Sequence, residues 1–194
     1  MTAGRGADII PNMMIEPAAD RVHLTFRFAE ANDAPRVAAL VNAAYRGNSG
    51  PVGWTTESHL LRGRRIDEAG ILALIQAPDS VILLSLDEGE VVGSVHLQKT
   101  VEATGYLGMF VVDPARQGGG IGKCFMREAE QTAQRLWGVR RMSMTVVSLR
   151  PELMAFYQRR GYQPTGEVVP FPFEDGLSVA LVDGIELAVM EKML

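Results

Sequence analysis

The sequence lacks most of the features that mark disulfide-stabilised, membrane-spanning or nucleic-acid-binding proteins. Its single cysteine, Cys124, excludes an internal disulfide and gives no basis for a metal cluster, which fits a reducing cytoplasm. No run of about 18 apolar residues is present that would span a membrane. Because 19 Lys and Arg are outnumbered by 23 Asp and Glu, the chain also lacks a basic footprint for nucleic acid. We therefore expect neither nucleic acid, nor a membrane, nor a metal as a partner.

Charge and hydrophobic content also restrict the class of partner and the number of domains that we expect. Only residues 62–65, Arg-Gly-Arg-Arg, are locally basic, and we interpret them as a solvated face. The net charge of −4 favours a cationic small molecule as the partner. Residues 1–21 mix glycine, proline and charge without periodicity, which predicts a flexible tail. The 47% hydrophobic content suits one domain with one core, placed at residues 22–194, and it leaves a homodimer open.

One stretch, residues 106–134, combines a buried strand, a glycine-rich turn and an amphipathic helix. Residues 109–112, Met-Phe-Val-Val, are a continuous apolar run typical of a strand covered on both faces, and Pro114 ends it because proline cannot donate to a sheet. The helix is predicted to begin within Gln-Gly-Gly-Gly-Ile-Gly, residues 117–122. Its first amide groups lack intrahelical partners and lie at the positive end of the helix dipole. They predict a binding site for a phosphate or pyrophosphate.

Three phosphate-binding motifs compete for this turn, and their spacing separates them. A P-loop fails at its first glycine and at its Ser or Thr, which are Gln117 and Cys124 here. The dinucleotide pattern G-x-G-x-x-G fails as well, because its third glycine falls on Lys123 or Phe125. The pattern that remains is Q-x-x-G-x-G at residues 117–122. A glycine-rich turn that binds no ligand stays an alternative.

The rest of the chain predicts strands interrupted by a few helices. Apolar residues alternate over residues 22–28, which predicts a strand, and a helix should begin at Asn32 or Asp33. Residues 47–63 are predicted to form a long loop, in which Trp54 either lines a substrate site or covers the core. The further predicted elements are a helix over 67–78, a hairpin of 80–86 and 90–99, a strand over 141–148 parallel to the central one, a helix over 151–161, and a hairpin of 177–182 and 185–193.

This order of elements, together with two motifs, resembles the GNAT superfamily of acyl-CoA N-acyltransferases. The first motif is Q-x-x-G-x-G after the strand end Val-Asp-Pro. The second is A-x-Y-x-x-x-G-[FY], which is met by Ala155, Tyr157, Gly161 and Tyr162. The resemblance covers about residues 22–194. It implies an α/β fold with a central mixed sheet of six or seven strands and about four flanking helices, in which the fourth and fifth strands splay apart and acyl-CoA lies in the gap.

The resemblance also implies which residues bind acetyl-CoA. The main chain of Phe110, Val111 and Val112 would bond the pantetheine arm, with Val112 nearest in sequence to the expected oxyanion donors. Arg150 stands where many members have an asparagine that contacts the pantetheine. The pyrophosphate would lie against the turn and the first residues of the helix, which are Gln117, Gly118, Gly119, Gly120, Ile121, Gly122 and Lys123.

The reaction implied is transfer of an acetyl group from acetyl-CoA to a primary amine of a small molecule or peptide, by direct attack in a ternary complex. Tyr157, about two turns into its helix, would protonate the departing thiolate; the alternative is that it packs in the core and bonds a backbone carbonyl. Glu102 is a candidate base and His96 a candidate base or substrate-binding residue, with Trp54 as a second substrate-binding candidate. The alternatives are that Glu102 and His96 are solvent-facing strand residues and that a chain of ordered water carries the proton. A sensor or scaffold that binds acyl-CoA without turnover stays open, although the intact tyrosine and glycine motifs favour an enzyme.

Overall fold

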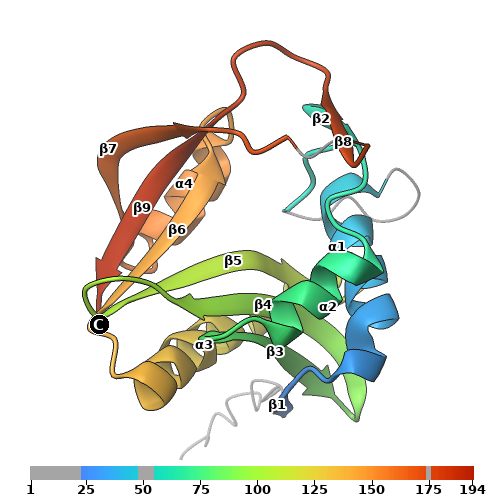
Figure 1. Ribbon diagram of the computed structural model, residues 1–194, viewed down its shortest axis with the longest axis vertical. Coiled ribbons are helices and arrows are strands. Elements are labelled where there is room, and N and C mark those ends of the chain that lie inside the picture. The colour runs from blue at the N-terminus through green and yellow to red at the C-terminus, as the bar shows by residue number, and fades with distance from the viewer. Residues whose placement is uncertain (1–22, 48–54, 174–175) are drawn as a thin grey trace, which may run out of the picture.

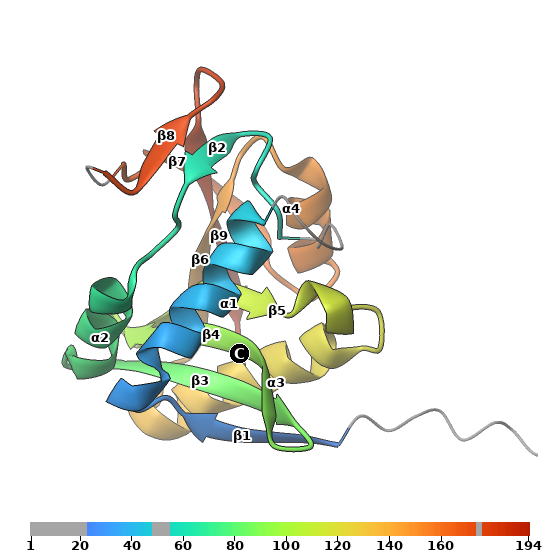
Figure 2. The same cartoon turned by 90° about the vertical axis from the view of Figure 1, so that its right-hand side faces the viewer.

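A computed structural model describes residues 23–47, 55–173 and 176–194. Its centre is a mixed seven-stranded sheet with the strand order β1-β3-β4-β5-β6-β9-β7 (Figures 1 and 2). The strands of this sheet are β1 Leu24–Phe28, β3 Ser80–Asp87, β4 Glu90–Lys99, β5 Thr104–Val112, β6 Arg141–Val147, β7 Gln163–Pro170 and β9 Glu186–Met193. The predicted mixed sheet is therefore confirmed, while the predicted tail of residues 1–21 and Trp54 lie outside the described residues.

Four α-helices lie on the described part of the sheet, and they fall on both of its faces (Figure 2). They are α1 Ala34–Arg46, α2 Glu68–Gln76, α3 Ile121–Trp137 and α4 Pro151–Gln158. Helices α1 and α2 share one hydrophobic cluster with β3, in which Val41, Ile71 and Leu84 are fully buried. Helix α3 packs on the opposite face, where Phe125 is fully buried. In the part of the chain that the structure describes, no helix is long and apolar enough to cross a membrane.

Strand β5 lies inside this arrangement and is buried on both faces, as its apolar run predicted. Phe110 and Val112 belong to the cluster that includes α3, whereas Val111 belongs to the cluster of α1 and α2. Side chains on either face of β5 therefore enter a hydrophobic core, which explains why its apolar residues are consecutive.

Strands β5 and β6 separate after a short parallel contact. Three residue pairs join them, and the last is Tyr106 with Ser143. Beyond Tyr106 the two strands diverge, so the edge of β5 from residue 107 to residue 112 has no neighbouring strand among the described residues (Figure 1). These are the fourth and fifth strands in chain order of the main sheet, and their splaying was implied by the resemblance.

An irregularity in β5 lies within the separated part. The register between β4 and β5 shifts between Ser94 and His96, as a β-bulge does. Opposite this shift, Met109 has a φ of 47°, a left-handed conformation that a non-glycine residue adopts only when its surroundings hold it there. A bulge re-aims the peptide groups beside it, so the main chain at residues 109–110 departs from the regular ladder.

A second, two-stranded sheet corrects two sequence predictions, and one strand of the main sheet was not predicted. The predicted hairpin of 177–182 with 185–193 is wrong: β8, Ser178–Ala180, pairs with β2, Leu61–Gly63, whereas β9 pairs with β6 and β7. Strand β2 also lies inside the predicted loop 47–63. Strand β7 was not predicted because Pro164 and Gly166 interrupt its pattern and its side chains are mostly exposed. An edge strand tolerates both residues, since one of its sides needs no ladder bonds.

Candidate active site

The turn after β5 is held by side chains that bond the main chain. The Asp113 carboxylate accepts a hydrogen bond of 2.9 Å from the amide of Ala115 and so fixes a short 3₁₀ turn. Gln117 then donates from its Nε2 to the carbonyl oxygen of Val112 at 3.0 Å. These two bonds bring the glycines back beside the end of β5.

Helix α3 begins at Ile121 directly after these glycines, as the sequence predicted. Gly120 is its N-cap, with a φ of 80° that favours glycine. The amides of Lys123 and Cys124 both donate to the Gly120 carbonyl oxygen at 3.1 Å. The amides of Ile121 and Gly122 precede the first intrahelical donor, so they are available to an anion at the positive end of the helix dipole.

Glycine leaves space at this turn where other residues would place a side chain. A Cβ added at Gly118 or Gly120 would meet no atom within 4 Å. A Cβ at Gly122 would lie 3.9 Å from Cγ2 of Val112 and 4.0 Å from Cε1 of Phe110, at the wall between the helix start and β5. A ligand can therefore approach the main chain closely along this wall.

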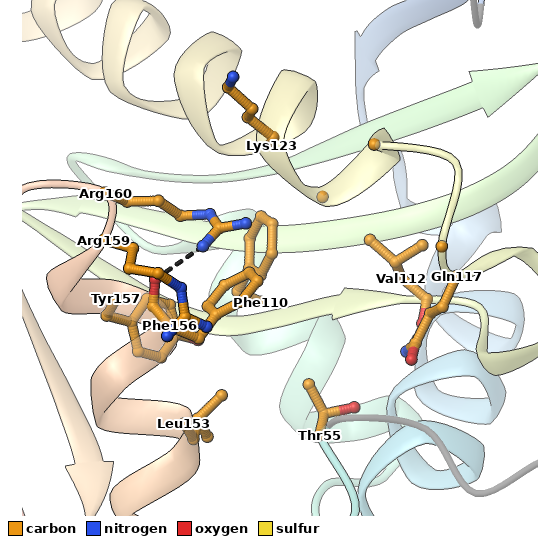
Figure 3. Close-up of a pocket in the computed structure, with 13 residues that line it drawn as sticks. Thr55, Phe110, Val112, Gln117, Lys123, Leu153, Phe156, Tyr157, Arg159 and Arg160 are labelled. Atoms are coloured by element: carbon orange, nitrogen blue, oxygen red, sulfur yellow. Dashed lines mark hydrogen bonds between the residues drawn. The ribbon is translucent and has the colours of Figure 1, made fainter. Parts of the chain in front are cut away.

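A cavity of about 290 Å³ opens between this turn, the end of β5 and helix α4, and we call it the turn cavity (Figure 3). Gln117 and Val112 lie on one side of it, while Arg159 and Arg160 lie on the other. The complete lining is Thr55, Phe110, Val112, Gln117, Gly118, Gly120, Gly122, Lys123, Leu153, Phe156, Tyr157, Arg159 and Arg160.

The α4 side of the turn cavity is basic. The Arg160 guanidinium lies 3.3 Å from the centroid of the Phe156 ring, and its Nη1 donates to the Phe156 carbonyl oxygen at 2.7 Å. Burial lowers the pKa of Arg160 from its ordinary value. A second hollow of about 350 Å³ continues past Arg159 and Arg160 and is also lined by Lys123, Arg127 and the ion pair of Lys192 with Glu130, which leaves an excess of positive charge. This chain of cations fits a ligand that carries several phosphates.

A smaller cavity of about 50 Å³ lies between the separated parts of β5 and β6, and we call it the strand cavity. Its walls come from both strands, from α4 and from segments remote in sequence. Its two charged lining residues are Glu57 and Arg65. Phe110, Leu153 and Tyr157 line both the strand cavity and the turn cavity, so the two cavities meet at these side chains.

Tyr157 is the side chain with an acidic proton at this junction. It is 5% exposed, and its ring packs edge-on against Phe156 and Tyr162. Its hydroxyl forms no hydrogen bond with another residue that the structure describes, in contrast to the carbonyl contact weighed from the sequence. Burial raises the pKa of Tyr157 and outweighs the charge of Arg160, which lowers this pKa; the carboxylate of Glu57 acts in the same direction as burial. The phenol therefore holds its proton at neutral pH.

Comparison with known proteins identifies the family. The profile described as the acetyltransferase (GNAT) family matches residues 52–162, which is more than half of the chain and includes the glycine turn and Tyr157. The chain belongs to the GNAT acetyltransferase family.

Solved structures of GNAT proteins share the fold. The yncA protein of Salmonella typhimurium, whose structure contains its cofactor acetyl-CoA, is 22% identical, with a TM-score of 0.61 over 88% of this chain and 94% of that one. The ribosomal-protein-S18-alanine N-acetyltransferase of Escherichia coli is 16% identical, with a TM-score of 0.61 over 88% and 93%. The IAA acetyltransferase of Bacillus cereus is 18% identical, with a TM-score of 0.61 over 88% and 99%. No protein of curated function matches the chain in sequence.

The structure does not bring Glu102 to the GNAT site. Glu102 lies in the turn before β5, its side chain is 83% exposed, and its carboxylate is 3.9 Å from the Arg141 guanidinium. That turn is at the end of β5 where β5 and β6 are still paired. Both cavities lie along the opposite half of the strand, so Glu102 lines neither of them.

His96 also lines neither cavity, although its ring packs edge-on against Tyr106, a residue of the strand cavity wall. Its Nε2 lies 2.9 Å from the Ser80 hydroxyl oxygen, which itself donates to the Leu74 carbonyl oxygen at 2.7 Å. Because a serine hydroxyl has one proton to donate, Nε2 of His96 must be the donor in the other bond. Burial lowers the pKa of His96 to about 4, so the ring is neutral at pH 7. No cluster of metal-binding side chains occurs within the described ranges.

Arg150, which departs from the family pattern, has a structural role here. Its side chain is 5% exposed, and it donates to the Thr56 carbonyl oxygen and pairs with the Glu152 carboxylate. Arg150 therefore ties the start of α4 to the segment that carries Thr55 and Glu57. The position contributes to the site by fixing one wall of each cavity.

Four charged residues of the site were not singled out from the sequence: Glu57, Arg65, Arg159 and Arg160. Arg65 was part of the basic run interpreted as a solvated face; its neighbours Arg62 and Arg64 are exposed, whereas Arg65 itself is half-buried. Arg159 and Arg160 lie inside the second GNAT motif, two and three residues after Tyr157, so their place at the end of the helix that carries Tyr157 could be inferred from spacing. No local sequence pattern around Glu57 indicates that its side chain is buried.

Proposed function

We propose that the protein is an N-acetyltransferase that moves an acetyl group from acetyl-CoA to a primary amine by direct attack in a ternary complex. The observation that carries this proposal is that Tyr157 lines both cavities. A donor in the turn cavity and an acceptor in the strand cavity would meet at one hydroxyl group. A cytoplasmic location and a homodimer remain predictions.

The residues of the turn cavity fit acetyl-CoA. The open amides of Ile121 and Gly122 would bind the pyrophosphate, and Gly118 and Gly120 leave the space for its approach. The unpaired edge of β5 from residue 107 to residue 112 offers amide and carbonyl groups to the pantetheine arm, which itself contains peptide-like amides. Arg159 and Arg160 would face the remaining phosphate charge. When bound, acetyl-CoA supplies the activated acetyl thioester.

The chain contributes position and proton transfer to the reaction. The neutral amine attacks the acetyl carbonyl carbon, so that a C–N bond forms and the C–S bond breaks. The Tyr157 hydroxyl gives its proton to the leaving sulfur, and the proton released by the nitrogen returns to the phenolate through water. Burial raises the pKa of Tyr157 and would raise that of a buried thiol in the same way, which keeps the donor and the acceptor of the proton comparable. The main-chain amides beside the bulge at Met109 would stabilise the carbonyl oxygen.

The test combines a thermal melt with a thiol-release assay. Acetyl-CoA at about 100 times its dissociation constant should add about 2.7 kcal/mol of stability and raise the melting temperature by roughly 5 °C or more. A panel of amines should then release free CoA thiol only when the acceptor is present. An unmoved melting temperature contradicts the proposal at its first step. Stabilisation without thiol release for any amine favours instead a sensor that binds acyl-CoA without turnover.

A further inference from the structure

The strand cavity contains one group of each charge. Glu57 is 5% exposed, and its Oε2 accepts a hydrogen bond of 2.7 Å from Nη1 of Arg46. Arg65 is half-buried, and its guanidinium lies 5.9 Å from the centroid of the Tyr45 ring. Within the described part of the chain this guanidinium forms no ion pair. An unpaired guanidinium in a cavity wall is a binding group for a carboxylate.

The two charges lie at different depths. The Glu57 amide donates to the Tyr45 carbonyl oxygen at 2.9 Å, and Glu57 lines the strand cavity together with Tyr157. Arg65 contacts the Tyr45 ring. Because Glu57 is 5% exposed whereas Arg65 is half-buried, Glu57 is the inner charge of the cavity and Arg65 the outer one.

The local charge selects against a polycation. Glu57 is neutralised by its ion pair with Arg46, which leaves Arg65 as the uncompensated charge among the described residues that line the cavity, although the whole chain is acidic with a net charge of −4. Charges inside a cavity act at short range and are weakly screened, so they outweigh the average charge of the surface. An uncompensated guanidinium in the wall matches an acceptor whose attacking amine is neutral and whose second group is a carboxylate. It opposes a polyamine, the class that the overall charge had favoured.

The other walls and the volume require a compact acceptor. They are apolar or aromatic for most of their extent, with Tyr106, Met109, Met144, Val146, Phe171 and Leu187 among the lining residues. A cavity of about 50 Å³ has room for only a few water-sized groups, since one water needs about 10–15 Å³ of this volume. A small aliphatic side chain fits such walls.

We propose that the acceptor is a compact amino acid with an aliphatic side chain, whose amine lies at Glu57 and whose carboxylate is bound by Arg65. This inference rests on the proposed acetyl transfer and adds the substrate class. The amine would then lie at the Tyr157 end of the cavity, where the acetyl group is presented. The carboxylate would lie at the outer end.

Three matched compounds test the substrate class: L-leucine, L-leucinamide, which lacks the carboxylate charge, and isoamylamine, which lacks the carboxylate altogether. L-Leucine should be acetylated with a kcat/KM at least about 10-fold higher than that of either analogue, because a charge-assisted bidentate bond is lost in both. Spermidine and a peptide with a free N-terminal alanine should be poorer acceptors than L-leucine. Isothermal titration of each compound, in the presence of CoA, supplies a second readout that is independent of turnover.

Arg65→Gln should abolish the preference for L-leucine over L-leucinamide in both assays while acetyl-CoA binding is unchanged. Arg62→Gln is the matched control, because Arg62 belongs to the same basic run but is exposed on β2. Glu57→Gln should weaken binding of all three amines; its melting curve must be checked, since removing one partner of a buried ion pair is destabilising.

The possible outcomes separate this inference from the proposed function. Equal or better acetylation of L-leucinamide, isoamylamine, spermidine or the peptide overturns the substrate class but supports acetyl transfer. A preference for L-leucine that survives Arg65→Gln overturns the role of Arg65. If the protein binds acetyl-CoA but neither acetylates nor binds L-leucine, the substrate class is also overturned. Failure to bind acetyl-CoA counts against the proposed function itself.

Discussion

The two cavities that meet at Tyr157 are built in different ways. One end of the turn cavity is formed by glycines and main-chain groups between the end of β5 and the start of α3, and the two arginines that follow α4 lie at its far side. The strand cavity is formed by side chains from β5, β6, α1, α4 and the segments around residues 57, 65 and 171. A site made of main-chain groups binds a chemical group that all its ligands share, such as a pyrophosphate. A side-chain site can change its ligand through a few substitutions, so specificity should reside there.

The largest expected effect breaks the main-chain site alone. Gly122→Glu should weaken acetyl-CoA binding by about 10³-fold, because the side chain brings bulk and like charge to the phosphates, and like-charge contacts cost several kcal/mol. Gly122 is a better position for this test than Gly118 or Gly120, whose positive φ would add backbone strain. Isothermal titration provides the dissociation constant.

Gly122→Ala is the matched control for that change. Its Cβ would make ordinary contacts of 3.9 and 4.0 Å with Val112 and Phe110, so the folded protein should keep affinity within a few-fold of the parent. If Gly122→Glu folds and binds acetyl-CoA as tightly as Gly122→Ala does, the helix start is not where the phosphates bind.

The next effect concerns His96, which lies outside both cavities. The pKa of His96 is about 4 in the folded protein, and that of an unfolded histidine is about 6.5. Below pH 6.5 the unfolded chain binds a proton that the folded chain does not, so the unfolding free energy falls as the pH decreases to 4. The contribution of this group is about 3 kcal/mol when complete.

Urea unfolding of the parent and of His96→Gln between pH 4 and pH 7 measures this contribution. The difference in unfolding free energy between the two proteins should shrink as the pH falls through this window. Turnover of His96→Gln at pH 7.5 should stay within about threefold of the parent, since a residue outside both cavities changes stability and not chemistry. A large loss of turnover in a folded variant would place His96 in the mechanism after all.

A smaller effect sharpens the description of the basic side of the turn cavity. Arg159→Gln should raise the dissociation constant of acetyl-CoA by about 3- to 10-fold, since Arg159 is exposed and its attraction to phosphate is screened by solvent. The loss should be smaller at high salt. Arg140→Gln, an exposed arginine that lines neither cavity, should leave the affinity unchanged. Equal effects of the two variants would show that the overall charge, and not the site, attracts the ligand.

The sequence predicted the glycine turn of the turn cavity, but it did not predict the strand cavity. The strand end, the glycine turn and the helix start are local, so their residue types and spacing determine the structure, and Gly120 and Ile121 lie where the motif placed them. The position of β5 inside the core was equally visible, because its apolar residues are consecutive and not alternating.

The strand cavity could not be predicted because it depends on which remote segments meet. Glu102 is close to β5 in sequence, yet it lies at the end of that strand where β6 is still paired. Arg65 is surrounded by exposed arginines in sequence, yet it reaches a cavity wall. The pairing of β8 with β2 was hidden as well, since the Asp183-Gly184 turn suggested a local hairpin, whereas long-range pairing has no local signal.

The most direct test of the account is the turnover of Tyr157→Phe, because it removes only the hydroxyl group at which the two cavities meet. With the chemical step limiting, kcat should fall by roughly 10²-fold or more, while the dissociation constant of acetyl-CoA stays within about twofold of the parent. Tyr162→Phe is the matched control: Tyr162 is fully buried beside Tyr157 and lines neither cavity, so its kcat should not change. If Tyr157→Phe turns over the acceptor as fast as the parent, the proton comes from water and the shared hydroxyl is not the centre of the site.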